Sequence, residues 1–433
     1  MKMVDINILL INPPSDCVDD DRVEPPLGLL YIASTLRKEG FANVFIYDMT
    51  GCKNIQEIND KINSIPNADI YGISCFSTNY NFVKKIIKKI RVDNSNSYVV
   101  LGGPHPSAMP LETLEDAKCD AVIVGEGEDA FTNLVKDYQK NIIKKGIFIG
   151  LGRDDIDSYP FPSRDLIDIS SYSRKLLGNP LIVMLSSRGC KNHCLYCNSV
   201  VMGGGNRNVR YRSSDNIVKE IFELIIKGYK NFRFNDDHFT GNPNLKELLI
   251  QLKKLNIQFR IFAKVEDLTE EICKLLKEAG CVHIAIGLES LNPANLKIIG
   301  KANQIGKETN VNIAKQNGLI VRSSFMVGLP YDNDETIAYY FTKASEIGLD
   351  EFSVYPLIPY PGTAIWKYPE KLGYKIVNKN YSEYIQLGRN QKTCFSLMHK
   401  NFTQEDVKRW YNLAHEILKN AGVKHMSDSE IAR

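Results

Sequence analysis

Three cysteines crowd into a short segment in the middle of the chain. Cys190, Cys194 and Cys197 form the pattern C-x-x-x-C-x-x-C. Three thiolates on one loop can bind three irons of a cubane iron–sulfur cluster and leave the fourth iron open to a small molecule. A structural zinc site needs a fourth ligand, and His193 inside the same loop is awkwardly placed to supply it. The spacing favours the cluster over a zinc knuckle or three ordinary cysteines.

The composition of the chain narrows its class. Among 433 residues, 43% are hydrophobic and 24% charged, which is usual for a globular protein. The net charge of +3 gives no electrostatic case for a nucleic-acid partner. No apolar run reaches the ~18 residues of a membrane span, and the first residues lack a secretory cleavage region. We therefore expect a cytoplasmic protein with no membrane partner, in which the seven other cysteines are scattered packing residues.

The first third of the chain alternates strand and helix patterns. This order predicts an α/β fold with a doubly wound, Rossmann-like parallel sheet in residues 1–145, whose ligand lies at the carboxyl ends of the strands. Helical patterns cover residues 27–38, 79–91 and 129–139. Strands are predicted over residues 6–11, 44–47, 70–75, 98–101 and 121–124.

A second alternating series follows an irregular stretch. Residues 146–179 contain Pro160 and Pro162 without sustained periodicity and are interpreted as a linker. Residues 180–365 then predict a partial (β/α)6 barrel, and residues 366–433 a short helical C-terminal extension, with a helix over 403–421. The barrel strands are predicted over residues 181–186, 231–235, 257–264, 282–287, 319–327 and 351–357.

The cysteine loop follows directly on the first predicted barrel strand, and Tyr196 precedes its last cysteine. In these features the chain resembles the radical S-adenosylmethionine superfamily. The resemblance implies that Cys190, Cys194 and Cys197 hold a 4Fe-4S cluster. It also implies that the open iron chelates the amino and carboxylate groups of S-adenosylmethionine, with Tyr196 near the adenine.

The resemblance extends to polar residues at later strand ends. Asp236 and Asp237 end the second barrel strand, and Glu289 ends the fourth. Ligand contacts in barrels gather at these ends, so the resemblance implies binding of S-adenosylmethionine or substrate there. Helix capping by the aspartates and a structural carboxylate at Glu289 stay open as alternatives. Arg260 and Lys264 on the third strand are weaker candidates, because a basic residue at a strand end is often simply solvated.

In the first domain, glycine-rich loops follow the predicted strands. Together with the Pro-Pro-Leu-Gly segment at residues 25–28, they resemble the cobalamin-binding domain that precedes the radical core in one branch of the superfamily. Glycine lets the backbone approach a flat macrocycle, although it also closes ordinary βα turns. The resemblance implies that cobalamin contacts Ser77, Thr78, Gly102, Gly103, Pro104, His105, Gly125, Glu126 and Gly127.

A motif for a lower cobalt ligand, D-x-H-x-x-G, occurs at residues 236–241. It lies in the barrel and not in the first domain, so we interpret it as a coincidence. His105 could approach the lower face of the cofactor, but a turn-stabilising role is favoured. The lower ligand of cobalt is not identified by the sequence.

The resemblance implies a cobalamin-dependent enzyme that reductively cleaves S-adenosylmethionine to a 5'-deoxyadenosyl radical and methylates an unactivated carbon, or phosphorus, of a small molecule or peptide. Electrons would come from a donor such as flavodoxin or ferredoxin. Two alternatives stay open: radical cyclisation, rearrangement or dehydration without methyl transfer, and a non-catalytic cobalamin or iron–sulfur sensor. No catalytic residue, substrate or oligomeric state is assigned from the sequence.

Overall fold

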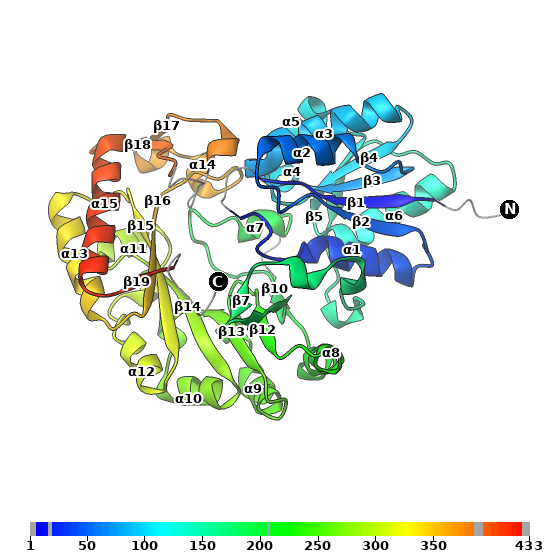
Figure 1. The fold of residues 1–433 in the computed structure, drawn as a ribbon. Helices are drawn as coiled ribbons and strands as arrows, with labels where there is room; N and C mark the ends of the chain where they lie inside the picture. Colours follow the sequence, from blue (N-terminus) through cyan, green and yellow to red (C-terminus); the bar gives the residue numbers. More distant parts are fainter. Residues whose placement is uncertain (1–5, 16–19, 206–207, 385–392, 427–433) are drawn as a thin grey trace.

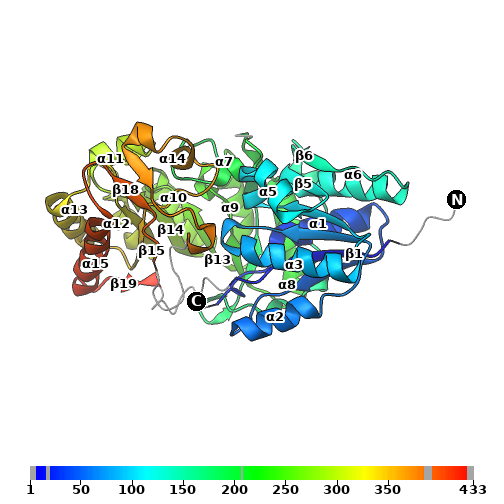
Figure 2. The ribbon, with the colours of Figure 1, turned by 90° about the horizontal axis from the view of Figure 1, so that it is seen from above.

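The computed structural model describes residues 6–15, 20–205, 208–384 and 393–426. They form two parallel α/β sheets, joined in sequence by an irregular segment, that lie side by side in both views (Figures 1 and 2). Within these residues, no helix is long and apolar enough to cross a membrane.

The first sheet has strand order β2-β1-β3-β4-β5-β6, with every pairing parallel. The five predicted strands are confirmed, and the reversal of order beside β1 is typical of a doubly wound sheet. The strands are β1 Ile8–Asn12, β2 Val44–Asp48, β3 Ile70–Ser74, β4 Tyr98–Gly102, β5 Ala121–Gly125 and β6 Gly146–Gly150.

Strand β6 corrects the prediction that the linker begins at residue 146. It pairs with β5 at the edge of the sheet, from Ala121 beside Gly146 to Gly125 beside Gly150. The strand is partly exposed, with Ile149 57% accessible, so it lacks the buried apolar run by which the inner strands are recognised. The irregular segment therefore starts after Gly150.

Helices cover both faces of the first sheet (Figure 1). One buried cluster joins α1 and α6 to the sheet, and a second joins α2 and α3 to its other face. This two-sided burial confirms the doubly wound architecture. The helices are α1 Leu27–Lys38, α2 Ile55–Asn63, α3 Tyr80–Asp93, α4 Pro104–Ala108, α5 Pro110–Ala117 and α6 Gly127–Gln139.

The second sheet has the order β19-β16-β15-β14-β13-β12-β9, again with parallel pairings. The six predicted strands are confirmed as β9 Ile182–Met184, β12 Asn231–Phe234, β13 Gln258–Ala263, β14 Cys281–Glu289, β15 Ile320–Val327 and β16 Glu351–Pro356. A short seventh strand that we did not predict, β19 Lys424–His425, extends the edge beside β16. Because the order ends at β9 and β19 among the described strands, the barrel is open.

The outside of the open barrel is covered by helices (Figure 1). They bury one continuous apolar cluster against the outer face of the strands. They are α8 Ser214–Ile226, α9 Leu245–Lys253, α10 Glu270–Glu278, α11 Pro293–Ile298, α12 Asn310–Gln316 and α13 Asp334–Glu346.

The C-terminal extension docks on the barrel. Helix α15 Gln404–Asn420 begins at a capping box in which the Thr403 side chain accepts from the Asp406 backbone, which confirms the predicted helix start. Its buried side includes Trp410 and packs on α13. The remaining elements are α7 Ser199–Met202, α14 Ala364–Lys367, β7 Lys175–Leu176, β8 Asn179–Pro180, β10 Ser187–Arg188, β11 Arg210–Tyr211, β17 Tyr374–Ile376 and β18 Leu397–His399.

Candidate active site

A cavity of about 760 Å³ lies between the two sheets, at the carboxyl ends of strands from both. Its size is in the range of pockets that hold small ligands and cofactors. Neither sheet encloses it alone. The first domain lines it with the loops after β1, β3, β4 and β5, and the barrel contributes Val183, Leu185, Ser187, Arg188, Gly189, Ser199, Met202, Gly203, Asn208, Arg210, Asn235 and Asp237.

The three predicted cluster ligands lie on the loop that follows β9 and β10, and each is partly exposed. Burial raises the pKa of the Cys194 and Cys197 thiols, and each of these thiols interacts electrostatically with Cys190. In the described part of the chain, no three His, Cys, Asp or Glu side chains converge on one point as a single metal ion requires. A cubane does not need such convergence, because each thiolate binds a different iron. The donor set therefore fits a 4Fe-4S cluster.

The cluster loop is docked against the end of the third barrel strand and against the segment that follows α11. Lys264 donates from the end of β13 to Asn192 Oδ1 at 2.7 Å, and Asn192 Nδ2 lies 3.1 Å from Cys190 Sγ. On the other side, a Cβ at Gly300 would lie 2.9 Å from the carbonyl oxygen of His193. Lys264, a weak ligand candidate from the sequence, thus supports the loop.

The two neighbouring aspartates after β12 differ in environment. The Asp236 carboxylate is buried and accepts from the backbone of Ser186 at 3.0 Å and from the hydroxyls of Ser186 and Ser187 at 3.0 and 2.5 Å. Its oxygens are used within the fold, which favours a structural role. Asp237 lines the cavity and accepts from Ser199 Oγ at 2.9 Å, so it is the carboxylate of the pair that faces the cavity.

Glu289 ends β14 with a backbone φ of 63°, in the left-handed region that is costly for a residue other than glycine. Lys301 Nζ holds its carboxylate at 3.2 Å and the Gly287 carbonyl at 2.6 Å. Burial, followed by the charge of Glu289, raises the pKa of Tyr196 well above its usual value. Tyr196 and Glu289 are therefore neighbours at the cluster loop.

On the cobalamin side, the predicted residues divide into two groups. Ser77 and His105 do not line the cavity among its described residues; they face each other at 3.0 Å. His105 is fully buried against Tyr80, and burial lowers its pKa to about 4. This geometry favours the turn-stabilising role. The residues that do line the cavity are Thr78, Gly102, Gly103, Pro104, Gly125, Glu126 and Gly127.

The glycines of the cavity rim serve different purposes. A Cβ at Gly102 would meet no atom of the described residues within 4 Å and would project into open space, which fits a backbone that leaves room for a flat ligand. Gly125 has φ 93°, and a Cβ there would lie 2.4 Å from the Gly150 carbonyl oxygen. Gly102 thus leaves open space at the cavity, whereas Gly125 is needed to pack β5 against β6.

Two arginines that the sequence analysis did not single out connect the domains. Arg188, just before the cluster loop, pairs with Glu126 at 2.8 Å and with Glu128 at 2.7 Å. Arg210 on β11 also pairs with Glu126. The sequence signal for this contact was weak: Arg188 lies two residues before Cys190, and Glu126 lies between two glycines.

The D-x-H-x-x-G motif follows β12 of the barrel, where His238 Nε2 lies 2.5 Å from Asp267 Oδ2. This confirms that the motif does not belong to the first sheet. The other cysteines within the described ranges are buried or half-buried, and Cys17 lies outside those ranges.

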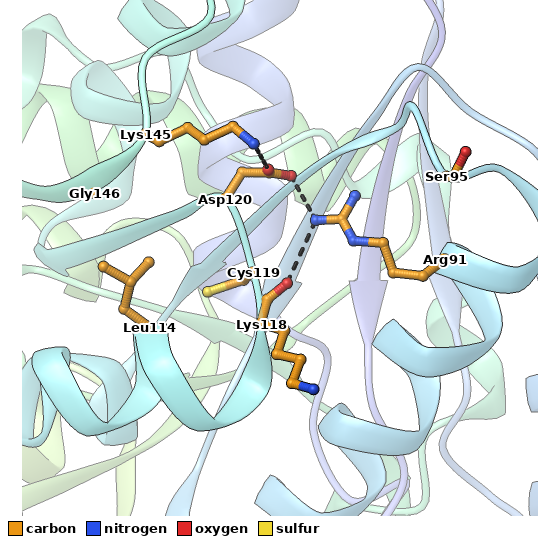
Figure 3. A pocket seen from close by; sticks show the side chains of 8 residues that line it. All are labelled: Arg91, Ser95, Leu114, Lys118, Cys119, Asp120, Lys145 and Gly146. Atoms are coloured by element: carbon orange, nitrogen blue, oxygen red, sulfur yellow. Dashed lines mark hydrogen bonds and ion pairs between the residues drawn. The ribbon is translucent and has the colours of Figure 1, made fainter.

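A second hollow of about 620 Å³ lies at the opposite, amino-terminal edge of the first sheet (Figure 3). Asp120 pairs there with two basic side chains, accepting from Arg91 at 2.6 Å and from Lys145 at 2.9 Å. It lies away from the cysteine loop and the glycine rim, so we do not assign it to the active site.

Comparison with known families matches both parts of the chain. Residues 21–135 match the model of the B12 binding domain, and residues 184–343 match that of the Radical SAM superfamily. An uncharacterized methyltransferase of Pyrococcus horikoshii is 30% identical over 431 residues, covering 93% of this chain and 90% of that protein. The anaerobic magnesium-protoporphyrin IX monomethyl ester cyclase of Cereibacter sphaeroides is 24% identical over 388 residues, covering 83% and 62% of the two chains.

Among solved structures, the radical S-adenosylmethionine methyltransferase TsrM from Kitasatospora setae, with cobalamin and a [4Fe-4S] cluster bound, has the same fold. The TM-score is 0.69 at 16% identity, and the match covers 96% of this chain and 89% of that one. The order and relative placement of the two domains are therefore shared.

Proposed function

Because the chain belongs to the cobalamin-dependent radical S-adenosylmethionine enzymes, we propose that it transfers a methyl group to an unactivated carbon, or to phosphorus, of a small molecule or peptide. The observation that carries the proposal is the single cavity walled by the cluster side of the barrel and by the glycine rim of the B12-binding domain. Methyl transfer needs both cofactors to reach one substrate, and a shared cavity permits this.

The cofactors are a 4Fe-4S cluster, S-adenosylmethionine and cobalamin, which together supply radical formation and the methyl group. The chain binds and orients them. Cys190, Cys194 and Cys197 hold the cluster, while Tyr196, Asp237 and Glu289 are our candidates for S-adenosylmethionine contacts. On the facing rim, Gly102 would leave space for the macrocycle.

The domain boundary keeps the two binding sites in register. The guanidinium of Arg188 lies over the rings of Tyr31 and Tyr159 at 4.8 and 5.0 Å while it pairs with Glu126 and Glu128. Arg188 therefore acts as a positioning residue, because it holds the start of the cluster loop against the B12-binding domain.

The test is anaerobic incubation of the reconstituted enzyme with a chemical or flavodoxin reductant, methyl-labelled S-adenosylmethionine and candidate acceptors. We expect 5'-deoxyadenosine and a labelled product in amounts that depend on added cobalamin. Formation of 5'-deoxyadenosine with no labelled product from any acceptor would contradict methyl transfer.

Radical cyclisation, rearrangement or dehydration without methyl transfer is the second candidate. It is favoured by the similarity to the magnesium-protoporphyrin ester cyclase, which spans 83% of this chain. This function predicts an unlabelled product whose mass shows no added methyl group. Membership of a family of enzymes argues against a non-catalytic sensor.

A further inference from the structure

A group of arginines faces the interior of the open barrel. Along β12, Phe232 and Phe234 belong to the outer apolar core, so Arg233 between them points to the opposite, inner face. The same alternation places Arg260 inside between Phe259 and Ile261. Arg322 follows the same rule on β15, after Val321 of the outer core. These three residues, together with Arg174, which shares Glu24 with Arg233, are called the lumen arginines below.

The strand register brings the lumen arginines together. Arg233 lies beside Arg260, and Arg260 lies beside His283 on the next strand. Arg322 on the following strand lies beside Glu351. Neighbouring strands are about 4.8 Å apart, so arginine side chains from β12, β13 and β15 can reach one common volume.

Carboxylates compensate only part of this positive charge. Glu24 pairs with both Arg233 and Arg174, and Glu351 lies 3.3 Å from His283. Arg260 is 1% exposed, and among the residues that the structure describes neither its Nη1 nor its Nη2 has a hydrogen-bond partner. Burial and the three other lumen arginines lower the pKa of Arg260 well below its usual range.

An unpaired guanidinium at this depth is unfavourable, because burying a charge costs free energy unless an opposite charge and hydrogen bonds replace water. Guanidinium groups match carboxylate and phosphate oxygens, with which they form paired hydrogen bonds. The site therefore has the chemistry of an anion pocket that needs its ligand.

The arginines also adjoin the active-site cavity. Glu24 lines that cavity and pairs with Arg233. Asn235, which lines the cavity too, lies two residues beyond Arg233, or about 7 Å farther along the chain. A molecule held by the lumen arginines could thus extend into the space that the cofactors share.

We propose that Arg260 and Arg322 bind a carboxylate or phosphate group of the substrate, so that the methyl acceptor is an organic anion whose charged end sits inside the barrel. The identification of the anion as the acceptor rests on the proposed function. The anion site itself rests only on the arginines.

The experiment uses the reconstituted holoenzyme with inorganic phosphate and acetate as separate probes, followed by calorimetric titration and thermal unfolding. Sodium chloride at equal ionic strength is the control for screening. We expect saturable binding of at least one probe and a higher unfolding temperature. The stronger probe distinguishes a phosphate-type from a carboxylate-type substrate.

The variants are Arg260→Met and Arg322→Met, which keep the length of the side chain and remove its charge. Each should weaken probe binding about tenfold or more, as expected for loss of charged hydrogen bonds. Arg260→Met should unfold at an equal or higher temperature without probe, because it removes a buried unpaired cation. Arg409→Met, at an exposed arginine on α15 paired with Asp334 and Asp406, is the matched control and should bind the probe as the wild type does.

Two results would overturn the anion site: no saturable response of the wild type to either probe, or unchanged probe binding in both lumen variants. Wild-type enzyme that forms 5'-deoxyadenosine but binds neither probe overturns this inference alone. Wild-type enzyme that binds a probe through Arg260 but forms no 5'-deoxyadenosine overturns the proposed function alone.

Discussion

Arg188 Nη1 lies 2.8 Å from Glu126 Oε2, in an ion pair that joins the barrel to the B12-binding domain two residues before Cys190. Both side chains are largely buried, at 14% and 12% exposure. Arg188 also pairs with Glu128 at 2.7 Å, and the Glu128 side chain is only 5% exposed, so loss of Arg188 would leave a buried carboxylate without its cation.

Replacing Arg188 with Met should therefore destabilise the protein strongly. We expect the free energy of unfolding to fall by about 3 kcal/mol, since the variant leaves Glu128 buried without its cation. Urea unfolding of the apoprotein measures it. Arg37→Met, at an exposed pair with Asp165, is the control and should change the value by less than about 1 kcal/mol. Equal losses of unfolding free energy in the two variants would show that the contact between the domains stabilises the protein no more than an exposed ion pair does.

Replacing Cys194 with Ala should abolish the brown colour of the anaerobic protein and the formation of 5'-deoxyadenosine. Two thiolates cannot hold the three irons that the loop is proposed to bind. Absorption spectroscopy, iron and sulfide analysis and product chromatography are the measurements. Cys273→Ala, at a buried packing cysteine on α10, should retain the cluster. Stoichiometric zinc without iron in the wild type would refute the assignment of the cluster.

Enlarging Gly102 should weaken cobalamin binding without unfolding the first sheet. A Cβ at this position meets no atom of the described residues within 4 Å, and Gly102 lines the cavity that a larger side chain would enter. We expect Gly102→Ala to weaken binding by a few fold and Gly102→Leu to abolish it, as measured by bound cobalamin after gel filtration. The unfolding midpoints of both variants should stay near the wild-type value. Full occupancy in the Leu variant would place the cofactor elsewhere.

Asp332 should make stability depend on pH. Its carboxylate accepts from the Gly328 and Leu329 backbones at 2.9 and 2.8 Å, and burial raises its pKa to about 7 from an ordinary value of 3.8. The folded state then binds the proton more tightly than the unfolded state, so this group's contribution to stability is greatest at low pH. It is lost as the pH rises from about 4 to about 7.

The Asp332→Asn variant cannot titrate at this position. Relative to it, the wild type should lose about 4 kcal/mol of unfolding free energy across that interval. Urea unfolding of both proteins at several pH values measures the difference. A difference that does not vary between pH 4 and pH 7 would mean that the carboxyl group keeps its ordinary pKa.

Local sequence patterns were sufficient to predict the cysteine loop and the inner strands of both sheets. The spacing of Cys190, Cys194 and Cys197 lies within one loop, and the inner strands carry apolar runs that no helix pattern explains. Strand β6 was not predicted because an edge strand with exposed residues such as Ile149 has a weak apolar pattern.

The roles of individual polar residues depend on partners that are distant in the sequence. Asp236 and Asp237 are adjacent in the sequence, which gives no reason to expect different roles. The hydrogen bonds from Ser186 and Ser187 after β9 identify Asp236 as the aspartate that is used within the fold. Arg260 was only a weak ligand candidate, because a basic residue at a strand end is often solvated, yet the interior of the barrel encloses it. The sequence could not show this, because the burial results from strands β12 to β16 assembling around it.

The cavity shared by the two sheets has a consequence for how this molecule can change over time. Neither domain forms the binding surface alone, so a mutation in one domain changes which ligands can bind against the other domain. Acceptance of a new substrate would then require substitutions in both domains. Replacing one domain with that of a distant relative would disrupt the cavity, because both domains line it.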